Sequence, residues 1–192
     1  MGQNPAESFL NSNLEAQDSN LFTYIKASTF PKIAVFPDGR FIVHSGPKLQ
    51  KVDANLIDLT FNAPLVGEYS SYPCQVKQIL ALPDGKVMLL TSSGGIEGST
   101  DKRLVRLNQY GSLDLTFNLN FPTNQISYKH LALQADGKLL IAYADEVSSK
   151  IVRLNTDGSI DTTFAFATNV NINSKFIVLP NGKIVFDSTN QD

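Results

Sequence analysis

The chain has 192 residues, of which 42% are hydrophobic and 18% are charged, and its formal net charge is −2. This composition excludes a disordered chain, and the weak net charge excludes a broad electrostatic attraction to nucleic acid. No run of 18 apolar residues is present, so we expect no membrane insertion. The single cysteine, Cys74, excludes an internal disulfide and a zinc site built from cysteines.

The first 30 residues match no repeat found later, and we predict an irregular N-terminal segment over 1–30. Its start, Met1–Pro5, lacks the basic region and apolar core of a secretory signal, so none is expected there.

From residue 31 onward, one phrase recurs four times: an apolar run, a turn, a basic residue and a second apolar run. The turn glycines are Gly39, Gly85, Gly137 and Gly182, and the differences between successive numbers are 46, 52 and 45. An Asp-Gly pair between two apolar runs predicts a β-hairpin with a tight I′ turn, which needs positive φ. A period of this size is typical of a repeat architecture.

A second phrase, Asp-x-Thr-Phe, closes three of the repeats. Its acids are Asp58, Asp114 and Asp161, and its aromatic residues are Phe61, Phe117 and Phe164. Between hairpin and tail, Leu104–Asn108 alternates apolar and polar residues as a half-buried strand does. Each full repeat therefore predicts four short antiparallel strands, which form one blade-like sheet.

The predicted domain over 31–192 is an all-β array of about three and a half blades, at about 31–62, 75–118, 129–165 and 174–187. The fourth repeat has only one hairpin, so the usual ring closure is not expected from these repeats alone. We favour a partial array or one completed by oligomerisation, because an open sheet edge invites pairing. A closed four-bladed ring, with Leu21–Thr29 supplying strands to the last blade, is the alternative.

The longest motif reads Arg106-Leu107-Asn108-x-x-Gly111-Ser112-Leu113-Asp114-x-Thr116-Phe117 and recurs from Arg153 to Phe164. It resembles the bacterial delta-sixty repeat, over most of residues 31–186. The resemblance implies a β-propeller, usually with more blades than this chain holds. The array of blades is then expected to be a partial or oligomer-completed propeller. It implies no catalytic activity, because that family is defined by its repeats.

The repeated residues have a structural interpretation. We expect each acid of the tail to cap a turn or to pair with the base of its own blade, which is Lys51, Arg106 or Arg153. The three phenylalanines are expected to pack between blades. The oxygen-bearing run Asn155–Asp161 has calcium-loop spacing, but the sister repeats lack it and Phe166 stands at the twelfth position. We therefore predict no metal and no cofactor.

Binding surfaces are indicated only weakly. Tyr69, Tyr72, Tyr128 and Tyr143 are predicted to lie in rim loops, where rigid rings give contact area to sugars or proteins. The two histidines, His44 and His130, occupy different repeat positions and predict no catalytic set.

The sequence thus favours a non-enzymatic structural or binding module that presents rim loops to a protein partner, to other copies of itself or to a glycan. A component of a virion, a tail fibre or another assembly, or a protein of the extracellular surface, fits this composition. A propeller hydrolase or lyase acting on a sugar or lactone is the alternative. Such an enzyme would gather acids and histidines at the mouth of the ring.

Overall fold

The computed structural model describes residues 32–45, 48–52, 57–64, 76–91, 96, 103–119, 126–144, 149–165 and 172–188. Eleven strands make four separate antiparallel sheets. The first holds β1 (Lys32–Val35), β2 (Phe41–Ser45) and β3 (Lys48–Val52), and the second holds β4 (Val76–Ala81), β5 (Val87–Thr91) and β6 (Leu104–Leu107). The third holds β7 (Ser127–Leu133), β8 (Leu139–Ala144) and β9 (Ser149–Leu154), and the fourth holds β10 (Ile172–Val178) and β11 (Ile184–Ser188).

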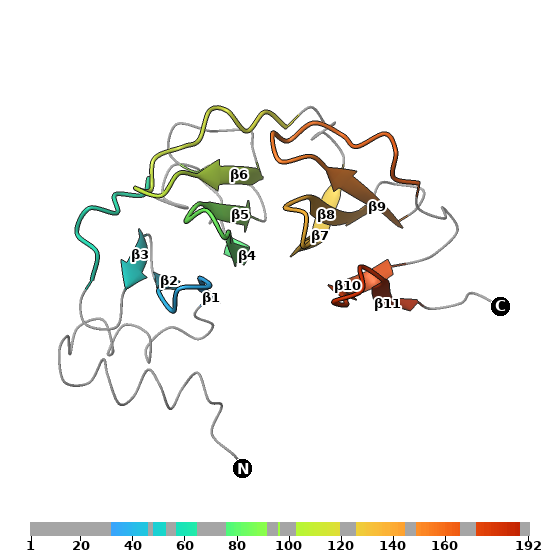
Figure 1. Cartoon of the computed structure of the whole chain (residues 1–192), viewed down its shortest axis with the longest axis horizontal. Coiled ribbons are helices and arrows are strands. Elements are labelled where there is room, and N and C mark those ends of the chain that lie inside the picture. The colour runs from blue at the N-terminus through green and yellow to red at the C-terminus, as the bar shows by residue number, and fades with distance from the viewer. Residues whose placement is uncertain are drawn as a thin grey trace, which may run out of the picture.

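The four sheets follow one another along an arc, with the first strand of each sheet nearest its centre (Figure 1). Contacts join β1 to β4, β4 to β7 and β7 to β10. Among the described strands, the arc leaves a gap between the first sheet and the β10–β11 hairpin (Figure 1). None of the described residues forms a helix long and apolar enough to span a bilayer.

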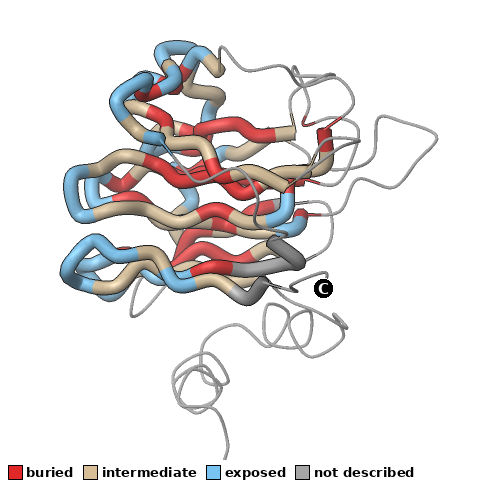
Figure 2. The backbone as a smooth tube through the Cα atoms, turned by 90° about the vertical axis from the view of Figure 1, so that its right-hand side faces the viewer, coloured by how far each residue is buried: buried red, intermediate tan, exposed pale blue. Residues whose placement is uncertain are grey.

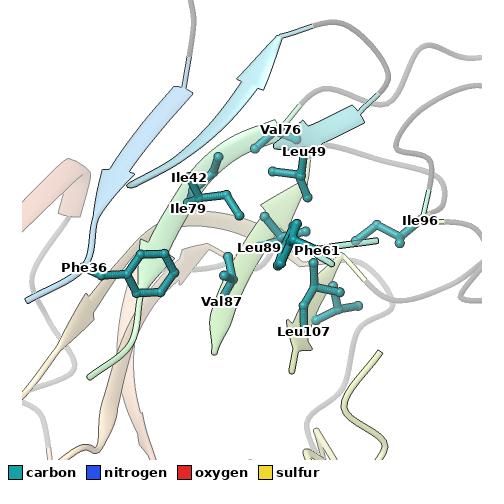
Figure 3. Packing of buried hydrophobic residues seen from close by; sticks show 11 residues of the cluster. Phe36, Ile42, Leu49, Phe61, Val76, Ile79, Val87, Leu89, Ile96 and Leu107 are labelled. Atoms are coloured by element: carbon teal, nitrogen blue, oxygen red, sulfur yellow. The ribbon is translucent and has the colours of Figure 1, made fainter. Parts of the chain in front are cut away.

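The middle strands of the second and third sheets, β5 and β8, are covered on both faces, because each of these sheets has a neighbouring sheet on either side. All five residues of β5 are buried, which explains its uninterrupted apolar run. Side chains alternate between the two neighbours: Val87 and Leu89 pack towards the first sheet, whereas Met88 and Leu90 pack towards the third. The core is therefore a series of layers between sheets, shown for the first interface in Figure 3.

The hairpin turns differ from the predicted two-residue I′ turn. The amide of Phe36 donates to the carbonyl of Arg40 at 2.7 Å, and the amide of Gly39 donates to the carbonyl of Phe36 at 3.0 Å. The loop thus has three residues and ends on Gly39 at φ +87°, which is the pattern of a turn followed by a glycine bulge. The other three hairpins share it, and these exposed turns gather at one rim, called here the turn rim (Figure 2).

The predicted fourth strand of each blade is reduced to a single bridge. Leu113 bridges Leu107, and equivalent bridges join Ile57 to Val52 and Ile160 to Leu154. The chain then turns at once, because the Asp-x-Thr-Phe tail closes its own turn, with the amide of Phe117 donating to the carbonyl of Asp114 at 3.2 Å. The strands β7 and β10 begin at residues 127 and 172, two residues before the predicted boundaries. The N-terminal segment 1–30 lies outside the described residues.

Neighbouring sheets are joined by the tail of one repeat and the second turn of the next. The amide of Asn62 donates to the carbonyl of Tyr110 at 2.8 Å, and the amide of Asn118 donates to the carbonyl of Asp157 at 2.9 Å. The backbone of the tail comes close to Gly111 in the second turn of the next repeat. Gly111 has φ +97°, and a Cβ on it would lie 2.7 Å from the carbonyl carbon of Asn62. Only glycine satisfies both the left-handed backbone and the close contact.

Candidate functional site

The tail of each full repeat builds the same polar cluster at the turn rim. In the second repeat, Oδ1 of Asp114 accepts hydrogen bonds from the amide of Thr116 at 3.0 Å and from its hydroxyl at 2.6 Å. The other carboxylate oxygen, Oδ2, pairs with Nε of Arg106 at 2.8 Å and with Nζ of Lys86 at 2.9 Å. Burial raises the pKa of the Asp114 carboxyl, but the hydrogen bonds from Thr116 and Lys86 outweigh it and hold that pKa well below its usual range.

The base of this cluster also reaches the next sheet. The guanidinium of Arg106 lies 4.9 Å from the ring centre of Phe117, a cation–π distance, and donates to the carbonyl of Thr156. Lys51 acts in the same way in the first repeat, where its ammonium donates to the carbonyl of Gln109 at 3.2 Å. The cluster is therefore a structural joint between sheets.

The third repeat builds the same cluster. The described part of the next sheet is the single β10–β11 hairpin, which offers no second turn for the cluster to contact. Asp161 pairs with Lys138 at 2.7 Å and with Arg153 at 2.8 Å, and its pKa is lowered, first by the Lys138 hydrogen bond and then by Thr163. Phe164 lies under Arg153 and is only partly buried, whereas Phe61 and Phe117 are buried.

Two of the four predicted rim tyrosines, Tyr128 and Tyr143, fall within the described residues, and both lie in strands and not in rim loops. Tyr128 lies on β7 and is 1% exposed within the core between the second and third sheets, where burial raises the pKa of its hydroxyl to about 12. Tyr143 lies on β8, directly opposite Tyr128, and is partly buried against the same core. The prediction that Tyr128 offers rim surface is wrong, because this residue lies within β7 and its side chain is buried in the apolar core between the second and third sheets. Tyr69 and Tyr72 lie outside the described residues.

The two histidines lie in different sheets, the first and the third. His44 lies on β2, and burial lowers its pKa. The ring of His130 on β7 meets the ring of Phe176 edge-on at 5.0 Å. In the Asn155–Asp161 run, the Asp157 oxygen accepts hydrogen bonds from the amide and hydroxyl of Ser159. Within the described ranges no group of three or more histidine, cysteine, aspartate or glutamate side chains is arranged to hold a metal.

A pocket of about 550 Å³ opens between the second and third sheets at the turn rim. Its walls are mostly apolar, and its polar groups come from the two hairpin turns, from Arg106 on β6 and from the second turn of the third repeat. The lining residues are Leu82, Pro83, Asp84, Met88, Arg106, Phe117, Leu133, Gln134, Ala135, Asp136, Gly137, Leu139, Asn155 and Thr156.

The pocket follows from one difference between repeats. The position directly before the hairpin turn differs between the four repeats, where it holds Phe36, Leu82, Gln134 and Leu179 in chain order. The buried ring of Phe36 packs between the first two sheets (Figure 3). Its centre lies 5.6 Å from the ammonium of Lys51. Leu82 has a smaller side chain at the equivalent place beside Arg106, so space remains next to it. No motif in the sequence signals this pocket, although an alignment of the repeats with one another reveals the exchange of Phe for Leu.

Residues 82–117 and 134–164 match the model of a family described as a domain of unknown function (DUF5122) beta-propeller. Together with the arc of antiparallel sheets, this match shows a β-propeller-like fold. All lining residues of the pocket except Leu133 fall within the two matched segments. A search of curated proteins finds no match.

Proposed function

We propose that this propeller is a non-enzymatic binding module whose turn rim receives a protein partner, and that its repeats are of the delta-sixty type. The observation that carries the binding function is the pocket between the second and third blades. A preformed and mainly apolar cavity with a few polar groups is the usual form of a ligand site. Its volume of about 550 Å³ is ample for one large apolar side chain.

The polar groups at the mouth favour a partner that also carries donors or positive charge. Asp84 and Asp136 are exposed and lie on opposite sides of the opening. Arg106 is already held by Asp114, Thr116 and the carbonyl of Thr156, so it adds little free positive charge. An apolar side chain next to an ammonium or amide group therefore fits better than an acidic ligand.

Small probes test this function on the full chain. Leucinamide, which carries an ammonium group, and neutral N-acetyl-leucinamide are titrated separately while the methyl signal of Met88 is followed by NMR. We expect saturable shifts for both probes, with tighter binding of leucinamide. A methyl glucoside titration tests a glycan ligand in the same way. Binding of the glucoside but of neither leucine probe would contradict the proposed protein partner.

A matched pair of variants tests whether the pocket is responsible. Leu82→Phe places in the pocket the side chain that the first repeat already has there, so it should abolish probe binding without loss of stability. Leu179→Phe makes the same exchange at the equivalent position of the fourth repeat and should leave binding unchanged. Equal binding by the wild-type chain and Leu82→Phe would refute the assignment of the pocket.

A second copy of the chain is a further partner that we propose. Ile177 and Val185 lie on the fourth sheet with 59% and 49% of their surface exposed, and β11 is the last strand of its sheet. An exposed apolar face beside an open strand edge favours association. Light scattering should give the mass of an oligomer, and Ile177→Lys with Val185→Lys should give the monomer. A monomeric wild-type chain at high concentration would refute self-association.

A further inference from the structure

Three basic residues gather where the second blade meets the third, at the end of the strands opposite the turn rim. Lys77 lies on β4, Arg103 directly precedes β6, and Lys129 lies on β7. The ammonium of Lys77 donates to the carbonyl of Tyr128 at 3.3 Å, and the guanidinium of Arg103 donates to the carbonyl of Ile126 at 2.6 Å. Both groups therefore converge on the short segment that leads into Lys129.

The two lysines occupy the same irregular position in successive repeats. The register of β4 against β5 shifts between Val76 and Gln78, and that of β7 against β8 shifts between Tyr128 and His130. Each shift leaves one extra residue, Lys77 or Lys129, without a cross-strand partner. A bulge of this kind re-aims a side chain and is common beside functional sites. Both lysines are exposed.

The spacing of the two strands that carry these lysines is fixed. The side-chain amide of Gln78 donates to the carbonyl of Leu131 at 2.8 Å and accepts from its amide at 2.9 Å. This two-point bond between β4 and β7 holds the lysines in place before any ligand binds. Preorganised donors lower the entropic cost of binding.

No carboxylate among the described residues neutralises the three cations. Burial lowers the pKa of Lys77, and the charges of Lys129 and Arg103 lower it further. Three like charges placed together without a counter-charge are unfavourable unless an anion joins them. Lys77 and Arg103 each use one donor on a carbonyl, and a lysine has three donors and an arginine five, so donors remain available.

We propose that Lys77, Arg103 and Lys129 form an oxyanion site, which binds the sulfate or phosphate group of a free ion or of an acidic glycan. Charge-assisted bonds from lysine and arginine to such oxygens are the strong kind of hydrogen bond. This site is separate from the pocket proposed above, which lies at the other rim, so either proposal can fail without the other.

Calorimetric titration of the full chain at low ionic strength tests the site. The ligands are sodium sulfate, sodium phosphate and a heparin-derived octasaccharide, with sodium chloride of equal ionic strength as the reference. We expect all three ligands to bind more tightly than chloride and to weaken as salt is added. Tighter binding of the octasaccharide than of sulfate indicates a glycan, and equal affinity indicates a free ion as the ligand.

The variants are Lys129→Gln alone and Lys77→Gln with Lys129→Gln. Each lost charge-assisted contact lowers the affinity for the anion. The double variant should therefore bind the anion at least about tenfold more weakly than the wild type, and Lys129→Gln should show a smaller loss of affinity. Lys183→Gln removes an exposed lysine beside the last hairpin turn and should stay within about twofold of the wild type. Anion binding no tighter than chloride, or equal losses in Lys183→Gln and the double variant, would overturn the proposal. Thermal melting shows that each variant is folded.

Discussion

Replacement of Gly111 by alanine tests whether the blades are locked together by the close approach of a turn to the preceding tail. Gly39 provides the matched control, since both glycines have positive φ, at +97° and +87°. They differ in their surroundings. A Cβ on Gly39 would meet nothing within 4 Å, whereas one on Gly111 would lie 2.7 Å from the carbonyl carbon of Asn62 and 2.8 Å from the amide nitrogen of Ala63.

The expected magnitudes follow from these distances. An alanine in the left-handed backbone conformation destabilises the folded state by about 1–2 kcal/mol. Replacing glycine also lowers the entropy of the unfolded chain, which stabilises the fold by about 0.4–1 kcal/mol. Gly39→Ala should therefore lower the free energy of unfolding by about 1 kcal/mol. In Gly111→Ala the blades must also separate, which adds about 1–3 kcal/mol for overpacking. Loss of the bond from the Asn62 amide to the Tyr110 carbonyl adds about 0.5–1.5 kcal/mol.

Urea denaturation followed by circular dichroism gives both values. We expect Gly111→Ala to lower the free energy of unfolding by about 2–4 kcal/mol more than Gly39→Ala, with little change in the urea dependence of that energy. Equal losses in the two variants, within about 0.5 kcal/mol, would show that the tail and the second turn do not hold the blades together.

Three further outcomes are expected. Phe117→Ala should destabilise by about 3–5 kcal/mol because its ring is buried between blades, and Phe164→Ala should cost clearly less because its ring is only partly covered; urea denaturation measures both, and the reverse order would contradict the packing. The lowered pKa of Asp114 means that its contribution to stability is present above the unfolded pKa of about 4 and is lost as pH falls towards the folded pKa, so melting temperature should fall less steeply between about pH 4 and pH 2 in Asp114→Asn than in the wild type. Chelator should leave the melting temperature unchanged, since the oxygens of the Asn155–Asp161 run serve their own turns and ion pairs; a clear drop would indicate a structural calcium ion.

The repeat carried most of the information about the fold. Alternating apolar runs with a glycine turn between them specify a hairpin locally, and their recurrence predicts similar sheets that bury apolar faces against one another. The length of the turn was not predictable in the same way. Asp38-Gly39 is compatible with a two-residue turn, but the bond from the Phe36 amide to the Arg40 carbonyl selects the three-residue loop.

Residues of one type took different roles according to their sheet register. Tyr128 resembles a rim tyrosine in the sequence, yet its place in β7 directs it into the core. Lys77 and Lys129 look like scattered surface charges until the bulges in β4 and β7 bring them to one interface. Such placements depend on the register in which the strands pair, and this register cannot be read from the sequence.

The sequence by itself determined an all-β protein built from similar blades, because hairpin and tail motifs act through short-range bonds that each repeat carries within itself. Only the tertiary structure decided where space and charge remain between blades. The pocket beside Leu82 exists because the ring that fills the equivalent gap at Phe36 is missing, and this depends on two sheets far apart in the chain. The basic site depends on the Gln78 side chain, which pairs with the backbone of the next blade and fixes the distance between the two lysines.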